Sequence, residues 1–279
     1  MLFKLNKKQF IDYFNYEDSN LISNIYDKIL LHERVNNPIY LNEFYSPNIW
    51  KKLLDLTGKI GCNIGTYGIF EESDRRFISI LSDYDDYEIY NYPVELLNII
   101  NMSAFSKLKH SDFLGALMSL GIKREKFGDL IVDKDECYVP VCSDIVEFIQ
   151  NNLIKIGKNP CKVKILNHYD KNQIPKYKFQ EKTIVVSSCR LDSIVASLGG
   201  ISRSNSEDMI KKGLVLLDYE KVIRKDIHVE INSIITLRGY GKFKIKEFLG
   251  RTLKGREKII IKKYIWVWGG RYGNYINGN

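Results

Sequence analysis

Apolar residues recur at helical spacing near the start of the chain. Between residues 6 and 35 they are Phe10, Ile11, Phe14, Leu21, Ile22, Ile25, Ile29 and Leu30. A further helix is predicted in SPNIWKKLLDLTG, because Ser46 suits an N-cap, Pro47 suits the first helical position and Gly58 suits a helix end. We therefore expect a small helical N-terminal domain over residues 1–75.

The hydrophobic period changes repeatedly between residues 76 and 170. RFISIL, VELLNII and CKVKIL predict strands, SDFLGALMSLG and SDIVEFIQNNLIKIG predict helices, and DLIVDKDECYVPVC predicts a hairpin. From Val94 onward the order is β-α-β-β-α-β, which is typical of the ferredoxin-like plait that RNA-recognition modules share. We expect a plait domain over residues 76–170, in which Tyr138 is the one central-strand aromatic placed to stack on a base.

Two helices are predicted after the polar linker NHYDKNQIPKYKFQEK. The first, RLDSIVASLGG, is stopped by two glycines and buries an apolar stripe made of Leu191, Ile194, Val195 and Leu198. The second, RSNSEDMIKKG, has Ser202 as its N-cap and ends at Gly213. We expect a third domain over residues 180–265, followed by a tail over residues 266–279.

Arg203 falls in the first turn of this second helix, where the helix dipole disfavours a cation. A residue that costs local stability suggests a function. Its guanidinium, the Ser202 hydroxyl and the free backbone N–H groups could together bind a phosphate. On this interpretation, Arg203→Ala leaves the free protein no less stable. Two alternatives stay open: Arg203 could point away into solvent, and Ser204 with Glu207 could cap the helix instead.

TLRGYGKFKIKEFLG predicts a basic strand after a Gly-Tyr-Gly turn. Alternation along a strand places Lys242, Lys244 and Lys246 on one face and Phe243 and Ile245 on the other. A row of like charges is electrostatically unfavourable unless a polyanion lies across it. KGREKIIIKKY then predicts a second basic strand.

Charge is unevenly distributed along the 279 residues. Basic and acidic residues number 10 and 15 in residues 1–100, 13 and 9 in residues 101–180, and 19 and 10 in residues 181–279. A basic C-terminal third within a chain of net charge +8 favours a polyanionic partner. Nucleic acid is favoured over a membrane because no amphipathic basic helix accompanies the charge. A solvated basic surface is the alternative.

The composition argues against a membrane protein and against a zinc protein. No apolar run reaches the roughly 18 residues of a spanning helix, and the N-terminus lacks a signal-peptide pattern. The five cysteines are scattered, without a CxxC pair or a His at zinc-ligand spacing. We therefore expect reduced thiols and a cytoplasmic monomer, with no cofactor and no metal.

Asp192 raises an enzymatic alternative, because CRLD could be the aspartate signature of a pseudouridine synthase with Asp192 as nucleophile. Asp192 also falls in the first turn of a helix, where a carboxylate interacts favourably with the dipole and can bond backbone donors or Arg190. The sequence favours this structural role, because the chain after Leu217 is too short for the catalytic domain that follows the motif in those enzymes.

A second enzymatic alternative is a nuclease or hydrolase site in the plait, in which His110, Asp112, Lys123, Arg124 and Asp129 would converge. A His that precedes a helix with Asp two residues on is more often a capping arrangement, and Gly-Asp is more often a turn. The sequence therefore favours a protein that is not an enzyme.

Residues 183–245 resemble the alpha-L RNA-binding motif of the small-subunit ribosomal protein S-four. The shared features are the R-L-D helix, the I-S-R-S helix start, the basic step Lys211-Lys212 and the closing R-G-x-G-K-F. With HSDFLGALMSLGIKREKFGDLIV and IVEFIQNNLIKIGK upstream, residues 65–264 resemble the YlmH family of bacterial RNA-binding proteins. Two turns depart from the motif, at Leu217 to Tyr219 and at Asn232 to Ser233.

The resemblance implies an α+β protein with a helical N-terminal domain, a central plait and a C-terminal alpha-L domain. It implies a ribosome-associated role in translation quality control, with ribosomal RNA and the large ribosomal subunit as partners and tRNA as an open further one. The RNA-binding residues that it implies, with Lys244 added from the basic strand, are Arg190, Ser202, Arg203, Lys211, Lys212, Arg238, Lys242 and Lys244.

Overall fold

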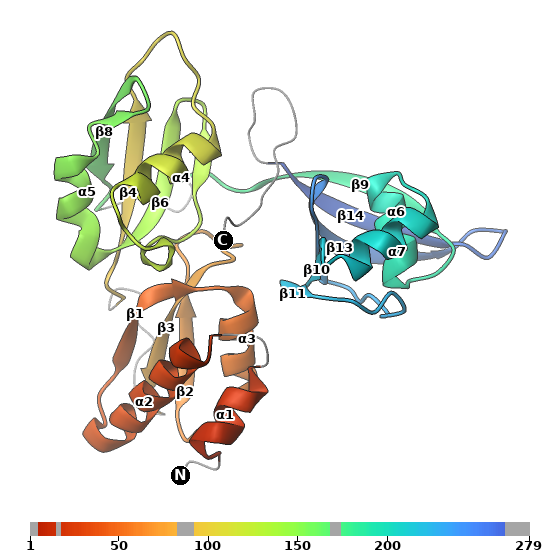
Figure 1. Ribbon diagram of the computed structural model, residues 1–279, viewed down its shortest axis with the longest axis horizontal. Helices are drawn as coiled ribbons and strands as arrows, with labels where there is room; N and C mark the ends of the chain where they lie inside the picture. Colours follow the sequence, from red (N-terminus) through yellow and green to blue (C-terminus); the bar gives the residue numbers. More distant parts are fainter. Residues whose placement is uncertain (1–4, 15–17, 83–91, 168–173, 266–279) are drawn as a thin grey trace. The chain divides into compact units, whose positions relative to one another are not determined.

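The computed structural model of the protein describes residues 5–14, 18–82, 92–167 and 174–265. The chain divides into two compact units, which are residues 1–176 and residues 177–279 (Figure 1). The predicted tail at residues 266–279 lies outside the described residues. No helix within the described ranges is long and apolar enough to cross a membrane.

The N-terminal part of the first unit combines helices with a sheet. Its elements are α1 (Lys7–Tyr13), α2 (Ser19–Val35), β1 (Ile39–Tyr45), α3 (Pro47–Leu56), β2 (Asn63–Tyr67) and β3 (Arg76–Leu81). The strands form an antiparallel sheet in the order β1-β3-β2. Helix α3 begins at Pro47 after the N-cap Ser46, as predicted.

The prediction of a small helical domain that ends at residue 75 is wrong, because this region contains a three-stranded sheet that extends to Leu81. Residues 76–81 form the central strand of the first sheet and not part of the plait. Phe77, Ile78 and Ile80 are fully buried, so both faces of β3 are covered. An apolar run such as RFISIL indicates a buried strand but does not identify the sheet to which it belongs.

The plait is confirmed from Val94 onward. Its elements are β4 (Val94–Asn101), α4 (His110–Ser119), η2 (Arg124–Lys126), β5 (Ile131–Asp133), β6 (Glu136–Cys142), η3 (Ser143–Ile145), α5 (Val146–Asn152), β7 (Lys155–Ile156) and β8 (Asn159–Ile165). The sheet order β5-β6-β4-β8-β7, with antiparallel neighbours, is that of a split βαβ fold with β7 added at one edge. The predicted hairpin turns at Lys134, which has a left-handed φ of 55°.

The second unit is a six-stranded antiparallel sheet with two helices. Its elements are β9 (Lys178–Val186), α6 (Leu191–Gly199), α7 (Arg203–Lys211), β10 (Val215–Leu217), β11 (Glu220–Lys221), β12 (Ile234–Leu237), β13 (Gly241–Arg251) and β14 (Glu257–Ile265). The strand order is β11-β10-β12-β13-β14-β9. Both helices cover the same sheet face, because Ile194 and Ile210 share one buried cluster with Phe243 and Ile245 (Figure 1).

The second unit begins before the predicted boundary at residue 180. Strand β9 starts at Lys178 and pairs with β14 along its whole length. Phe179 packs edge-on against Tyr264, with 4.8 Å between their ring centroids. The departure from the motif at Asp218 and Tyr219 is a tight turn with left-handed φ values of 49° and 73°, and the Asp218 carboxylate accepts the backbone N–H of Ile234 at 2.8 Å.

Candidate nucleic-acid interface

The first turns of α6 and α7 are joined by a buried carboxylate. Asp192 has no solvent-exposed side-chain area, whereas the side chain of Arg203 is 53% exposed. Arg203 donates to Asp192 Oδ2 through Nε at 3.0 Å and through Nη2 at 2.8 Å. Arg190 donates to both carboxylate oxygens at 3.2 and 3.3 Å, and the Ser193 backbone N–H donates to Oδ1 at 3.0 Å.

These contacts change the interpretation of Arg203. The positive charge of Arg203 in the first turn of α7 is neutralised by Asp192 of α6, so Arg203 joins the two helices. We therefore expect that Arg203→Ala lowers stability, and no longer that it leaves stability undiminished. Sequence reasoning missed this pair because Asp192 lies on the neighbouring helix, and only the packing of α6 against α7 brings the two charges together.

The Asp192 carboxylate is held as an anion. Burial raises its pKa, but the hydrogen bonds and charges of Arg203 and Arg190 outweigh burial, so the pKa lies below its usual value. Fully buried and bonded by two guanidinium groups, the carboxylate serves as a structural link. This is the role that the sequence favoured over nucleophilic attack on a base.

Ser202 is the N-cap of α7, as predicted, and its hydroxyl accepts the backbone N–H of Asn205 at 3.1 Å. The rival cap at Ser204 is not used. Ser206 in the next turn donates to the Asp192 carbonyl oxygen at 2.9 Å. The start of α7 is therefore fixed against α6 by side-chain contacts with two consecutive turns.

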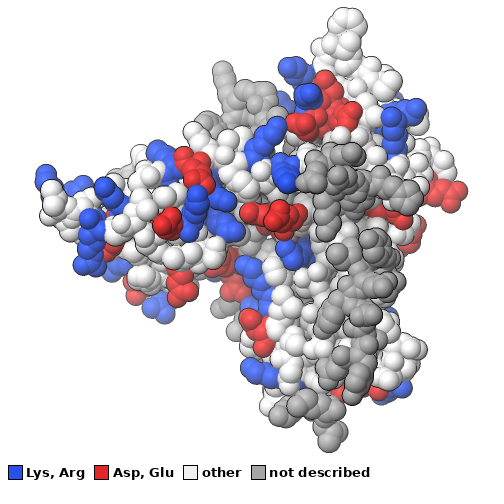
Figure 2. All heavy atoms as spheres, turned by 180° about the vertical axis from the view of Figure 1, so that it is seen from behind, with Lys and Arg blue, Asp and Glu red and all other residues white. Residues whose placement is uncertain are grey.

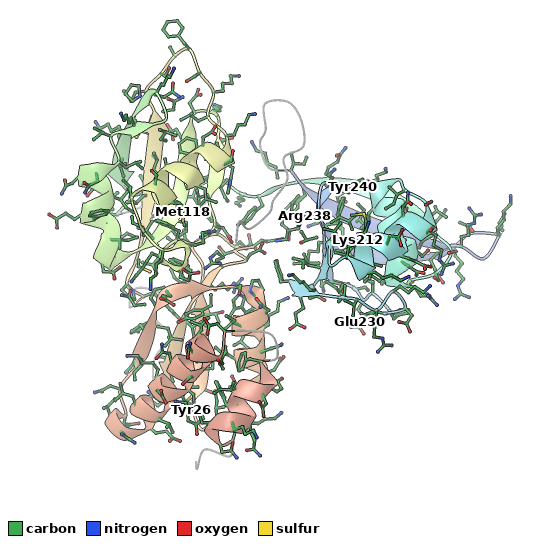
Figure 3. All side chains as sticks on the ribbon, viewed as in Figure 1. Tyr26, Met118, Lys212, Glu230, Arg238 and Tyr240 are labelled. Carbon is green, nitrogen blue, oxygen red and sulfur yellow. The ribbon has the colours of Figure 1, made fainter. Side chains whose placement is uncertain are left out.

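Lys211, Lys212 and Arg238 gather at the other end of α7. Lys212 is the C-cap residue of α7, and the Arg238 backbone N–H donates to the Leu214 carbonyl at 3.0 Å. All three side chains are exposed. Both Lys212 and Arg238 are labelled in Figure 3. Cations at the C-terminus of a helix are favoured by the dipole, so this cluster is compatible with a stable fold while facing solvent.

Lys242 lies inside the unit, contrary to its predicted place on an exposed face. Its side chain is only 7% exposed. The ammonium lies 4.9 Å from the ring centroid of Tyr219 and 4.3 Å from that of Tyr264. These two aromatic rings come from a turn and from the last strand, and they account for the buried cation by cation–π attraction. Lys242 is therefore unsuited to a direct phosphate contact.

The predicted alternation along β13 holds as far as Ile245, after which a register shift between Ile245 and Glu247 interrupts it at Lys246. Phe243 and Ile245 enter the core beneath the helices, so Lys244 points to the opposite sheet face. Lys244 is partly exposed and lies opposite Lys262 in the strand register. Lys246 is exposed and pairs with Glu181 at 2.6 Å. The eight predicted residues thus divide among the starts of α6 and α7, the C-terminal end of α7, the far face of the sheet and the interior.

The alternative nuclease group in the plait has structural contacts instead. Asp112 accepts the Lys109 backbone N–H at 2.7 Å and caps α4. Asp129 accepts the backbone N–H groups of Asp74 and Arg75. Arg124 donates to the carbonyl oxygens of the η2–β5 connection, while Lys123 is an exposed N-cap of η2. The Asp129 contacts join the segment before β3 to the plait, whereas the contacts of Asp112 and Arg124 lie within the plait.

His110 is buried at the start of α4. Burial and then the positive charge of Arg124 lower its pKa to about 4, so the ring is neutral at pH 7. Over the part of the chain that the structure describes, no three His, Cys, Asp or Glu side chains are grouped so that they could hold a metal ion. Neither observation favours catalysis at this group.

Comparisons with known proteins agree with the family resemblance. Residues 87–170 match the family model described as "Putative RNA-binding domain in YlmH". The chain is 26% identical over 223 residues to "Ribosome-associated protein quality control protein P2" of Bacillus subtilis (strain 168). The aligned residues cover 80% of this chain and 86% of that protein. The solved structure "Cell division protein ylmH from Streptococcus pneumoniae" is 25% identical, with 54% of this chain and 94% of that chain covered and a TM-score of 0.44.

The family model and the Bacillus subtilis relative confirm the predicted resemblance to the YlmH family. The matched family model ends at residue 170, before the second unit begins. The alpha-L domain at residues 180–265 and the RNA-binding residues in it therefore stay predictions.

Proposed function

We propose that this protein binds ribosomal RNA through its second unit and acts in the cytoplasm as a ribosome-associated factor of translation quality control, without catalysis. The observation that carries the proposal is the exposed cluster of Lys211, Lys212 and Arg238 in the basic third of the chain. The resemblance of the chain to the YlmH family and the name of the Bacillus subtilis relative support the ribosome as the partner. The large ribosomal subunit is the proposed binding partner, with tRNA as a further RNA that could be contacted there.

Phosphate contacts supply most of the affinity in this proposal. Lys and Arg that neutralise phosphates release counterions, so binding weakens as salt rises. Lys211, Lys212 and Arg238 are exposed and project from the C-terminal end of α7 and the β12–β13 turn. Lys244 adds a cation on the far face of the sheet. Lys242 is removed from the proposed RNA face because it is buried between two tyrosines.

Arg203 and Arg190 can bind RNA and still hold the helices together. A guanidinium has five N–H donors, and Arg203 directs only Nε and Nη2 at Asp192. More than half of its side chain faces solvent. We propose that the buried carboxylate orients both guanidinium groups, so that their outward N–H groups meet a phosphate beside the capped start of α7.

The direct test is the salt dependence of binding to purified large-subunit ribosomal RNA. In Lys211→Ala/Lys212→Ala, the slope of log affinity against log salt should become shallower by about 0.7 to 0.9 for each lost phosphate contact. Lys211→Arg/Lys212→Arg retains both charges and should keep the slope of the native chain. An unchanged slope in the alanine variant, with RNA still bound, would exclude this cluster from the interface.

A further inference from the structure

The loop between β13 and β14 is an ordered five-residue connection. Arg251 and Glu257 form the last strand pair, and the residues between them are Thr252, Leu253, Lys254, Gly255 and Arg256. The Thr252 N–H donates to the Arg256 carbonyl at 2.7 Å, and the Thr252 hydroxyl accepts the Arg256 N–H at 3.0 Å. Gly255 has a φ of 72°, which favours glycine. Backbone contacts and the Thr252 hydroxyl therefore define the loop without using its long side chains.

This loop projects beyond its neighbouring strand. Strand β9 ends at Val186, which pairs with Glu257, so residues 252–256 have no strand beside them in the sheet. The chain continues from β9 toward Arg190, which places the loop at the same end of the sheet as the start of α6. Lys211, Lys212 and Arg238 belong to the opposite end of β13, about 30 Å away at 3.3 Å per residue.

Three of the four cations in and beside the loop form no ion pair in the part of the chain that the structure describes. Arg251 pairs with Glu257 at 2.7 Å. By contrast, the side chains of Lys254, Arg256 and Lys258 form no ion pair within the described residues. Three uncompensated charges on one short hairpin repel each other, and folding gains nothing from them. Such a set is typical of a surface that meets a polyanion.

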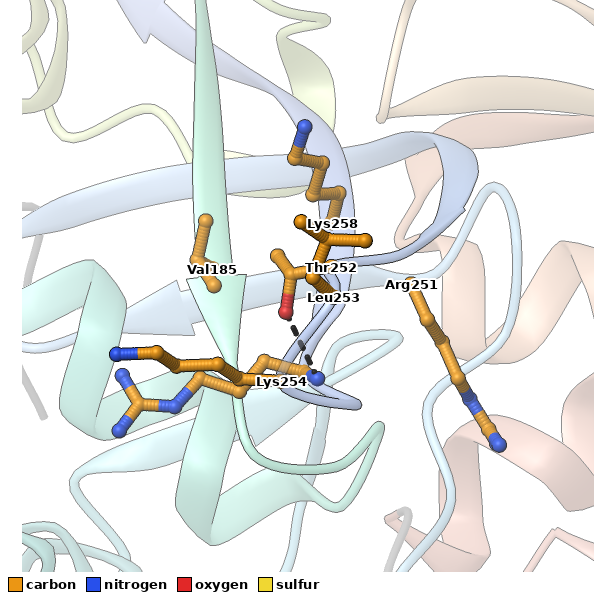
Figure 4. A pocket seen from close by; sticks show the side chains of 7 residues that line it. Val185, Arg251, Thr252, Leu253, Lys254 and Lys258 are labelled. Atoms are coloured by element: carbon orange, nitrogen blue, oxygen red, sulfur yellow. Dashed lines mark hydrogen bonds between the residues drawn. The ribbon is translucent and has the colours of Figure 1, made fainter.

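These side chains surround an open hollow of about 520 Å³ beside the edge strand (Figure 4). Val185, Thr252 and Leu253 contribute apolar atoms to its wall, and Lys254, Arg256 and Lys258 supply charge. Leu253 is fully exposed, at 109% of its reference area. Figure 2 shows several Lys and Arg side chains at one end of this unit. The hollow therefore joins several cations to an apolar wall.

We propose that the β13–β14 hairpin is a second RNA contact, in which Lys254, Arg256 and Lys258 bind backbone phosphates and Leu253 packs against a ribose or base. Charge complementarity identifies RNA phosphate as the occupant. The inference rests on the proposed function and adds to it a contact on the hairpin, at the end of the sheet opposite to Lys211, Lys212 and Arg238. Because the two ends are about 30 Å apart, they touch phosphates that are not neighbours in the RNA.

The test compares the full-length chain with Lys254→Ala/Arg256→Ala/Lys258→Ala for binding to purified large-subunit ribosomal RNA over a range of salt. The slope of log affinity against log salt should become shallower by about 2 to 2.7, from three contacts of 0.7 to 0.9 each. Lys254→Arg/Arg256→Lys/Lys258→Arg keeps the charges and should match the native slope. Leu253→Ala should weaken binding without changing the slope. The thermal midpoint should be the same in all variants, because the changed side chains are exposed.

The outcomes separate this inference from the proposed function. RNA binding by the native chain with an unchanged slope in the triple alanine variant overturns the hairpin contact alone. Failure of the native chain to bind RNA overturns both. If the variant binds naked RNA normally but no longer sediments with intact large subunits, the hairpin meets a ribosomal protein, and RNA as its occupant is excluded.

Discussion

Asp192 joins the first turns of α6 and α7. It receives hydrogen bonds from Arg190, Arg203 and the Ser193 N–H while fully buried. Removing the charge of such a carboxylate leaves its donors poorly compensated, which costs about 1–3 kcal/mol. We predict that Asp192→Asn lowers stability by this amount. Arg203→Ala should cost less, since Arg190 remains in contact.

The pH dependence follows from the lowered pKa of Asp192. A carboxyl group whose pKa is lower in the folded state contributes its full stabilisation above its ordinary pKa of about 4, and the contribution is lost as pH falls through the folded value. Thermal unfolding between pH 7 and pH 3 should therefore bring native protein and Asp192→Asn closer together in acid. Equal stabilities at pH 7, or pseudouridine made by the native chain and not by the variant, would contradict the structural role.

Lys242 and Lys244 provide a matched pair on one strand. Lys242 is buried between Tyr219 and Tyr264, and cation–π contacts of this kind contribute about 0.5–2 kcal/mol each. Lys242→Ala should destabilise the unit and leave the salt slope of RNA binding unchanged. Lys244→Ala should leave the stability unchanged and flatten the salt slope of RNA binding, because Lys244 points to the open sheet face. A flatter salt slope in Lys242→Ala would show that its ammonium reaches RNA.

At the scale of elements, β9 completes the second unit. Ile184 and Val186 enter its core, and the strand pairs with β14 along its whole length. We predict that a fragment of residues 177–265 folds alone and unfolds cooperatively by circular dichroism. A fragment of residues 187–265 lacks these side chains and should be much less stable. An unfolded 177–265 fragment would contradict the independence of this unit.

The sequence predicted the elements whose signals are local. The β-α-β-β-α-β order and the helices at residues 191–199 and 203–211 follow from periodicity, caps and glycines within a few residues. It missed β1, because a bulge between Leu41 and Phe44 interrupts the alternation along that strand. The partner of β3 was also missed, because a run buried on both faces has no preferred sheet until distant strands pair with it.

The same limit applied to the candidate site. Exposed lysines at the end of α7 could be predicted from the helix and its glycine stop. The structural contacts of Arg203 and Lys242 could not be predicted in this way. The partner of Arg203 lies 11 residues away on another helix. The partners of Lys242 lie on a turn and on the last strand. Charge alone does not tell a cation that faces RNA from one that neutralises a buried carboxylate or stacks on tyrosine.

At the scale of the whole molecule, the positive charge lies mainly at the C-terminal end of the chain. Residues 181–279 contain 19 basic and 10 acidic residues, whereas residues 1–100 contain 10 and 15. Such an asymmetry favours electrostatic capture of RNA by the second unit and leaves the first unit available for other contacts. Association with the ribosome should therefore depend strongly on salt.

The most direct measurement is sedimentation of a lysate that contains the full-length chain through sucrose gradients of low and high salt. We predict that the protein travels with the large ribosomal subunit at low salt and moves to the free fraction at high salt, because phosphate contacts dominate the affinity. Lys211→Ala/Lys212→Ala should leave the subunit at a lower salt concentration than the native chain. A native chain that stays in the free fraction at low salt, or travels with the small subunit instead, would contradict the proposed function.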